Sequence, residues 1–202
     1  AGVLFGAVAI GYAAWRGMPN WQSVPSTWDA VWHANTIRWI LDTGQASPTH
    51  MGELRNTDTH AELYYPSVFH ALAAVLAAVT AGYRRRPKLL ARALATVPLA
   101  CAHARDLSRR RHPPHIHAHF ATYPALAAWV CARLIGTSYS FTAHAHDIYV
   151  DTSMLDRKIA DARFVVTISE YNRELLGRHN PAHTPIHVVH MGIDTASYPF
   201  RP

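Results

Sequence analysis

The chain has 202 residues, of which 50% are hydrophobic and 16% are charged, so it can bury a sizeable core and is not a disordered chain. Its net charge of +6 favours anionic partners, but few aromatic residues interleave with the basic runs, which argues against nucleic acid. Two isolated cysteines exclude a disulfide framework and fit a reducing compartment.

Residues 1–83 are expected to form a mainly helical segment of membrane-protein character. The segment opens on an uncharged run, Ala1–Trp15, which is shorter than the roughly 20 residues that span a bilayer. Both the tail of a transmembrane helix and a buried helix fit this run. Further helices are expected over Trp28–Leu41, ended near Gly44, and over Ser67–Ala81.

From Arg84 onward the pattern changes to strands alternating with helices. A basic helix over Lys88–Arg111, kinked or split at Pro98, comes first. The later elements follow in this order: strand His115–Phe120, helix Pro124–Leu134, strand Tyr139–Thr142, helix Leu155–Ala162, strand Phe164–Ile168, helix Glu170–Leu176 capped by Ser169, and strand Ile186–His190. This alternation predicts an α/β fold with a partial parallel sheet and helices on both of its faces. A domain boundary is therefore expected between residues 83 and 84.

Polar side chains follow the expected strands at the points where the strands end. His119 ends the first strand, His144 and Asp147 follow the second, and Ser169 and Glu170 follow the third. Because ligands bind at the carboxyl ends of strands in open parallel sheets, these residues predict a binding site. A neutral imidazole can hydrogen-bond a hydroxyl group of a ligand, and a carboxylate such as Asp147 can fix its tautomer.

Three strings carry a resemblance to a known family. HIHAHFATYPALAAWVCARLIGTSYSFTAHAHDIY, followed by RKIADARFVVTISEYNRELL and IHVVHMGID, resembles the family 4 glycosyltransferases of the GT-B class over about residues 84–202. The resemblance implies two Rossmann-like domains across a cleft, with the acceptor on the N-terminal one and a nucleotide-sugar on the other. It implies sugar transfer with retention of configuration and without a metal or cofactor.

The family's opening strand with its glycine-rich loop and its donor-binding domain are not recognised, so the chain is expected to be an acceptor-side fragment without activity of its own. The resemblance assigns contact with the reacting sugar to two residues of the TAHAHDIY loop, His144 and Asp147. It assigns substrate binding to residues at the other strand ends: His119, Ser169, Glu170, Asn172, Arg173, Gly192 and Asp194.

The histidines also fit a metal-dependent hydrolase, which is the alternative function. His115, His117 and His119 alternate along one strand face, as the metal ligands of several zinc hydrolases do. The HAHD segment would supply the remaining ligands: His144, His146 and Asp147. A non-catalytic interaction domain is a third reading.

Residues 1–83 resemble, more weakly, part of a multi-pass actinobacterial membrane protein of uncertain function. WDAVWHANTIRWILDTG and YYPSVFH carry this resemblance, and the two halves of the chain fit either a fusion or two separate genes. Asp29, His33 and His70 fit either a site for a metal or a polyprenyl-phosphate sugar, or an exposed polar face.

The resemblance and the charge together predict the partners. A nucleotide-sugar, a sugar or lipid-linked acceptor, and no nucleic acid are expected. The arginine runs Arg84–Arg86 and Arg109–Arg111 fit either docking on an anionic membrane surface or a solvated helix face. The expected location is the cytoplasm, at the inner face of the plasma membrane, with residues 1–83 embedded in that membrane.

Overall fold

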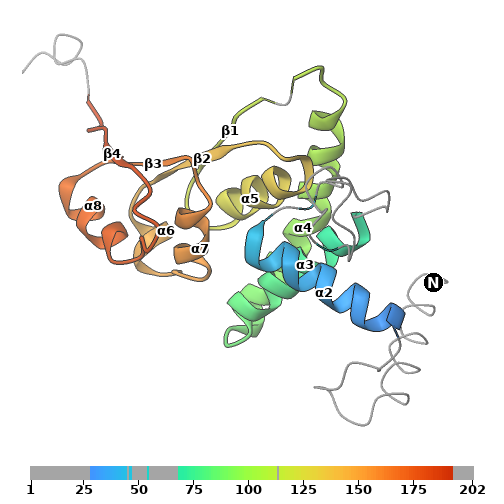
Figure 1. Cartoon of the computed structure of the whole chain (residues 1–202). Helices are drawn as coiled ribbons and strands as arrows, with labels where there is room; N and C mark the ends of the chain where they lie inside the picture. Colours follow the sequence, from blue (N-terminus) through green and yellow to red (C-terminus); the bar gives the residue numbers. More distant parts are fainter. Residues whose placement is uncertain (1–27, 45, 47–53, 55–67, 113, 193–202) are drawn as a thin grey trace, which may run out of the picture.

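The computed structural model of the protein describes residues 28–44, 46, 54, 68–112 and 114–192. Their helices and strands follow in chain order (Figure 1): α2 (Trp28–Thr43), α3 (Val68–Tyr83), α4 (Pro87–Ser108), β1 (Ile116–His119), α5 (Tyr123–Ile135), β2 (Tyr139–Ala143), α6 (His146–Tyr149), α7 (Leu155–Ala160), β3 (Phe164–Thr167), α8 (Glu170–Gly177) and β4 (Ile186–Val188). The predicted α/β fold, a partial parallel sheet preceded by helices, is confirmed.

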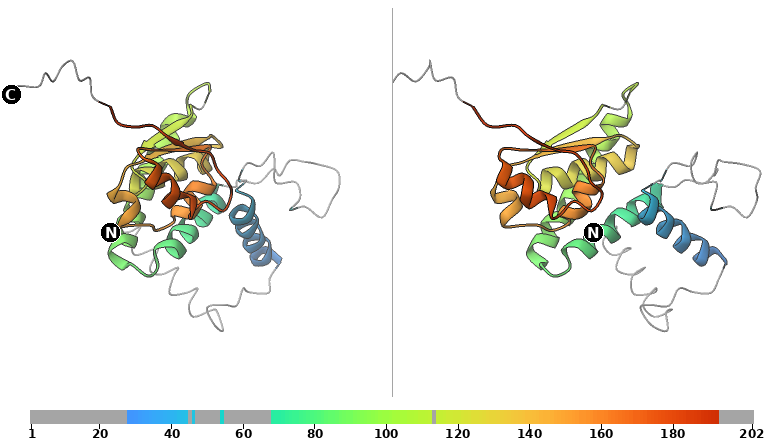
Figure 2. Two further views of the ribbon diagram at one scale, coloured as in Figure 1. Left: turned by 90° about the vertical axis from the view of Figure 1, so that its left-hand side faces the viewer. Right: turned by 60° about the vertical axis from the view of Figure 1, so that its left-hand side comes forward.

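Each strand of the sheet lies beside the strand that precedes it in the chain, always on the same side. Its four strands lie in the order β1-β2-β3-β4, and every neighbouring pair is parallel. Because connections between parallel strands are right-handed, a sheet that always adds the next strand on the same side keeps its helices on one face. Figures 1 and 2 show α5, α7 and α8 together on that face. No helix among the described residues covers the other face, so the expectation of helices on both faces is wrong for this part of the chain, because the strand order never reverses.

The hydrophobic core lies between the sheet and these helices. Ala118, Phe141 and Val165 stand side by side on β1, β2 and β3 and are buried beneath α5 and its neighbours. The α4 helix packs along α5, and α3 packs along both of them. Val79 and Tyr83 of α3 therefore belong to the same buried cluster as the sheet. The division of the chain after residue 83 stays a prediction, and α3 shares the core of the sheet.

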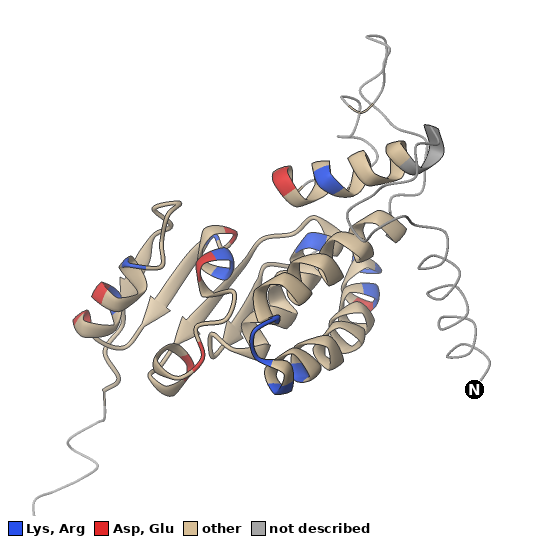
Figure 3. Cartoon of the chain, turned by 90° about the horizontal axis from the view of Figure 1, so that it is seen from below, with Lys and Arg blue, Asp and Glu red and all other residues tan. Residues whose placement is uncertain are grey.

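The α4 helix runs for 22 residues through Pro98 as one element, so of the two expected effects of this proline a split does not occur, and a kink stays a prediction. Basic residues follow one another on the turn that joins it to α3, which is blue in the ribbon of Figure 3. None of the helices in the described residues combines the length and apolar character needed to cross a bilayer. The run Ala1–Trp15 lies outside the described residues.

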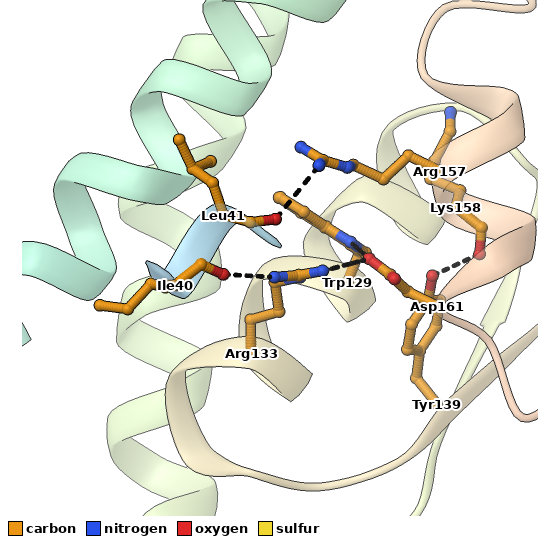
Figure 4. A network of polar contacts seen from close by, with 8 residues as sticks. All are labelled: Ile40, Leu41, Trp129, Arg133, Tyr139, Arg157, Lys158 and Asp161. Atoms are coloured by element: carbon orange, nitrogen blue, oxygen red, sulfur yellow. Dashed lines mark hydrogen bonds and ion pairs between the residues drawn. The ribbon is translucent and has the colours of Figure 1, made fainter. Parts of the chain in front are cut away.

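The carboxyl end of α2 is capped by a cation from α5. The side chain of Arg133 donates to the carbonyl of Ile40 at 3.5 Å and forms an ion pair with Asp161 at 2.7 Å. Asp161 also accepts a 2.6 Å hydrogen bond from the indole N–H of Trp129 (Figure 4). The last carbonyls of a helix have no partner within it, so this arginine ties α2 to the α5–α7 side of the core.

Two predicted helix ends are confirmed at glycines whose backbone adopts a left-handed conformation. Gly44 and Gly136 follow α2 and α5 with φ angles of 77° and 68°, in the left-handed region that a side chain disfavours. Ser169 caps α8 as expected, since its hydroxyl accepts a hydrogen bond from the N–H of Asn172. Strand β4 is shorter than predicted, because pairing with β3 ends at Val188.

Gly82 allows α3 to approach the loop before α7, and this gives a test of the packing. A Cβ at Gly82 would lie 2.2 Å from Cγ of Met154. We expect Gly82→Ala to lower the free energy of unfolding by about 1–3 kcal/mol, as overpacking does. Urea denaturation measures the change. Gly177→Ala is the matched control, because a Cβ there meets nothing within 4 Å and should be neutral or stabilising by up to about 1 kcal/mol. Equal stability of both variants would contradict the close packing.

Candidate functional site

The uncovered face of the sheet carries a ladder of histidines and hydroxyls across β1 and β2. His117 bonds Ser140 Oγ through Nδ1 at 2.7 Å and Thr142 Oγ1 through Nε2 at 2.9 Å. His115 bonds the same Ser140 hydroxyl at 2.7 Å. The alternation therefore does place these rings on one face, and their nitrogens are engaged by hydroxyls. Among the described residues no group of three or more His, Cys, Asp or Glu is placed to hold a metal. Nothing in this arrangement favours the hydrolase alternative.

Three rings meet where β1 and β2 end. The His119 and His144 rings are stacked with centroids 6.0 Å apart, and the Phe120 ring lies 4.7 Å from that of His144. Phe120 has a φ of 77°, which is uncommon for a bulky residue, and its side chain is 49% exposed. Strained backbone of this kind is often found at binding sites. The sequence placed both histidines at this edge and gave no signal for the conformation of Phe120.

Asp147 joins the loops that carry these rings. Its carboxylate is only 3% exposed and accepts backbone N–H bonds from Ala121 at 2.7 Å, Ala145 at 2.8 Å and His144 at 3.0 Å. These charge-assisted bonds fix the backbone on both sides of the site. The bonds reach the backbone of His144 and not its imidazole, so the expectation that Asp147 sets the His144 tautomer is corrected.

A buried lysine holds the same loop from the other side. Nζ of Lys158 donates to the carbonyl of Ala121, while the carbonyl of Lys158 accepts from the hydroxyl of Tyr139. Burial lowers the pKa of Lys158 to about 8, and the carboxylates of Asp151 and Asp147 partly oppose that shift. The Ala121 peptide is thus bound at both its N–H and its C=O. The sequence did not single out Lys158, because one lysine in an amphipathic helix is expected on the face exposed to solvent.

The start of α8 is tied to the end of β2 by Asn172. Its side chain is 2% exposed, donates to the carbonyl of His144 and accepts from the hydroxyl of Tyr149. Its backbone N–H bonds the Ser169 hydroxyl at 3.2 Å. Asn172 and Ser169 therefore brace the loop that presents the His144 ring.

Four residues of the predicted site remain: Glu170, Arg173, Gly192 and Asp194. Glu170 and Arg173 lie on the open side of α8, with side chains 56% and 53% exposed, and pair with each other at 2.6 Å. Gly192 is exposed beyond β4. Asp194 lies outside the described residues.

His33 and His70, the two histidines of the first 83 residues that the structure describes, lie together between α2 and α3. His33 of α2 and His70 of α3 share a hydrogen bond of 2.7 Å between Nδ1 and Nε2, and their rings stack. Burial and the neighbouring His33 lower the pKa of His70. The side chain of Asp29 is outside the described part of the chain, so the predicted set of Asp29, His33 and His70 is only partly seen.

An open parallel sheet with its polar loops at the carboxyl edge defines a Rossmann-like domain. The chain belongs to glycosyltransferase family 4, which it matches over residues 52–197. A family of unknown function, DUF6541, matches residues 1–83, so the two matches overlap on the segment that contains α3. No curated protein and no solved structure gives a match.

Removing the Asp147 carboxylate tests the brace. In Asp147→Ala the buried N–H of Ala121 and the part-buried N–H groups of His144 and Ala145 lose their acceptor, and Lys158 loses a nearby anion, so we expect the free energy of unfolding to fall by about 3 kcal/mol or more. Urea denaturation at pH 7 measures it. Glu170→Ala removes an exposed carboxylate one helix turn from Arg173 and should cost less than about 1 kcal/mol. A loss for Asp147→Ala no larger than for this control would show that the brace does not stabilise the fold.

Proposed function

We propose that these residues form the acceptor side of a retaining GT-B glycosyltransferase, which moves a sugar from a nucleotide-sugar to an acceptor hydroxyl. The observation that carries the proposal is the ring cluster at the strand ends: His119, Phe120 and His144 come together on braced loops. Aromatic faces pack well against the C–H faces of a sugar, and an imidazole bonds its hydroxyls. Family membership supports sugar transfer as the chemistry of this edge.

The proposed roles follow from exposure. His144 and His119 contact the reacting or neighbouring sugar, and Glu170 and Arg173 bind polar groups of the substrate from α8. Asp147 and Asn172 act as positioning residues, since their buried side chains hold the backbone of His144. We also propose the Ser169 turn, Gly192 and Asp194 as parts of the substrate-binding surface.

The proposed mechanism requires this domain to orient the acceptor more than to transfer a proton. In a retaining reaction on the front face, the departing donor phosphate can take the proton of the acceptor hydroxyl. The domain then contributes positioning and electrostatic stabilisation, which a rigid loop supplies better than a mobile one. The proposal includes no metal and no cofactor, because the nucleotide-sugar is a substrate.

We further propose that the enzyme works in the cytoplasm at the inner face of the plasma membrane. The exposed arginine runs at the two ends of α4 and the net charge of +6 support an anionic surface as a neighbour. A lipid-linked acceptor in cell-surface polysaccharide or glycolipid synthesis fits that position.

The 202 residues alone are expected to be inactive, because the family divides donor and acceptor binding between two domains. Incubation of the purified chain with UDP- and GDP-sugars and with sugar or lipid acceptors should give no product above a blank. Reproducible turnover by this chain would show that it binds both substrates.

Replacing His144 tests the proposed site in the full-length transferase. His144→Ala should remove a contact to the reacting sugar and lower kcat by roughly ten- to a thousandfold, or about 1.4–4 kcal/mol. Steady-state kinetics and melting temperatures are measured together. His103→Ala, on an exposed position of α4, is the control and should leave kcat and KM unchanged. Unchanged kinetics in a stable His144→Ala variant would assign His144 a structural role.

A further inference from the structure

A second polar pocket lies where the turn between α3 and α4 meets the loop that follows α6. The pocket has a volume of about 420 Å³ and opens to solvent. Its polar lining comes from three consecutive arginines and three hydroxyl-bearing residues: Arg84, Arg85, Arg86, Tyr83, Thr152 and Ser153. The ribbon of this turn is blue in Figure 3, where Lys and Arg residues are coloured blue. None of these residues belongs to the sugar site proposed above.

The pocket carries more positive than negative charge. Arg86 is anchored by Asp151 at 3.3 Å and by the carbonyl of Val150 at 3.4 Å. Within the described part of the chain, Arg84 and Arg85 have no carboxylate at ion-pair distance, and both are exposed. The α4 helix begins at the next residue, Pro87, without a side-chain cap, so its amino end adds partial positive charge at the rim.

The wall of the pocket offers ordered hydrogen-bond donors. Ser153 donates its backbone N–H to Asp151 at 3.0 Å, which fixes the loop that carries Thr152 and Ser153. Tyr83 is 1% exposed, and its buried hydroxyl has no hydrogen-bond partner among the described residues. The hydroxyl donors of the wall that remain for a ligand are therefore those of Thr152 and Ser153.

We propose that this pocket binds a phosphate or diphosphate group carried by a larger molecule. Planar guanidinium groups match phosphate oxygens with paired hydrogen bonds, and hydroxyl donors complete the shell. The pocket is larger than a single phosphate requires, so there is room for the atoms that bear it. The group could be borne by a soluble phosphate ester or by the headgroup of an anionic lipid.

The pocket and the sugar site stand on connected structure. Asp151, which anchors Arg86, and Asp147, which braces His144, both act on the buried Lys158. A phosphate held at the arginines therefore lies beside the segment that links β2 to α7, which also carries His144 of the ring cluster. The binding proposal itself uses no step of sugar transfer, so it stands or falls independently of the proposed function.

Binding of inorganic pyrophosphate to the purified chain tests the pocket. The chain provides a matched pair of variants: Arg84→Ala/Arg85→Ala removes two arginines of the pocket, and Arg109→Ala/Arg110→Ala removes two exposed arginines at the far end of α4. Both change the net charge equally. We expect the first to weaken pyrophosphate binding by about tenfold or more and the second by less than about twofold in calorimetric titrations at fixed salt. Melting temperatures confirm that both variants fold.

Two results would overturn the proposal. Equal weakening in both double variants would mean that pyrophosphate responds only to net charge. No measurable binding to the parent chain would mean that the pocket does not hold a phosphate. Ser153→Ala adds a variant without a charge change, and it should weaken binding by about two- to fivefold if the hydroxyl donates to the ligand.

Vesicles distinguish the source of the phosphate group. Vesicles of phosphatidylglycerol in phosphatidylcholine are compared with phosphatidylcholine alone in a sedimentation assay. A lipid headgroup carries the phosphate if three results hold together. The parent chain sediments with the anionic vesicles, pyrophosphate releases it from them, and Arg84→Ala/Arg85→Ala abolishes the sedimentation. If pyrophosphate binds at the pocket and anionic vesicles do not retain the chain, the bearer is a soluble phosphate ester. Both results support the pocket.

Discussion

The backbone around Ala121 is held by two opposite charges, and the rest of the site depends on this arrangement. The Asp147 carboxylate binds its N–H and the Lys158 ammonium group binds its C=O. A buried charge is costly unless it is paired and hydrogen-bonded. Here Asp147 accepts hydrogen bonds from the loops after β1 and after β2, and Lys158 donates one to the loop after β1. The loops after β1 and β2 therefore behave as one rigid unit. The His119, Phe120 and His144 rings are brought together because their backbone is fixed from beneath.

The same physics explains which parts of the structure the sequence could predict. Period-two alternation correctly placed the histidines of β1 on one face, and Ser169 and Gly44 marked helix ends through local hydrogen bonds and backbone preferences. The hydrogen-bond partners of each histidine depend on how the strands pair. The HIHAH segment alone therefore could not predict that its histidines bond the hydroxyls of Ser140 and Thr142. Burial of Lys158 and the strained φ of Phe120 arise only when distant loops meet. Asp147 was found for its position, and its contacts with backbone groups were not foreseen.

The α3 helix connects the two family matches physically. Its sequence lies in the region where both matches overlap, and its buried face packs on α4 and α5. The α2 helix then packs on α3, and Arg133 of α5 bonds its carboxyl end. A change in α2 can therefore reach α5, which supports β1 and β2, through two contacts. Within the described part of residues 1–83, α2 and α3 are therefore joined to the sheet and its helices through packed side chains.

The histidine ladder gives the open face of the sheet a sensitivity to acid. Burial, with His119 and His115 nearby, lowers the pKa of His117 from its usual value of 6.5. The unfolded chain therefore takes up this proton more readily than the folded one, and stability contributed by the neutral ring is present above pH 6.5 and is lost as the pH falls below it. Protonation of His117 also turns its acceptor nitrogen into a donor, so one of its two hydroxyl partners must then accept instead of donate. A face that is a neutral mesh of hydrogen bonds in neutral solution carries a positive charge in its middle in an acidified one.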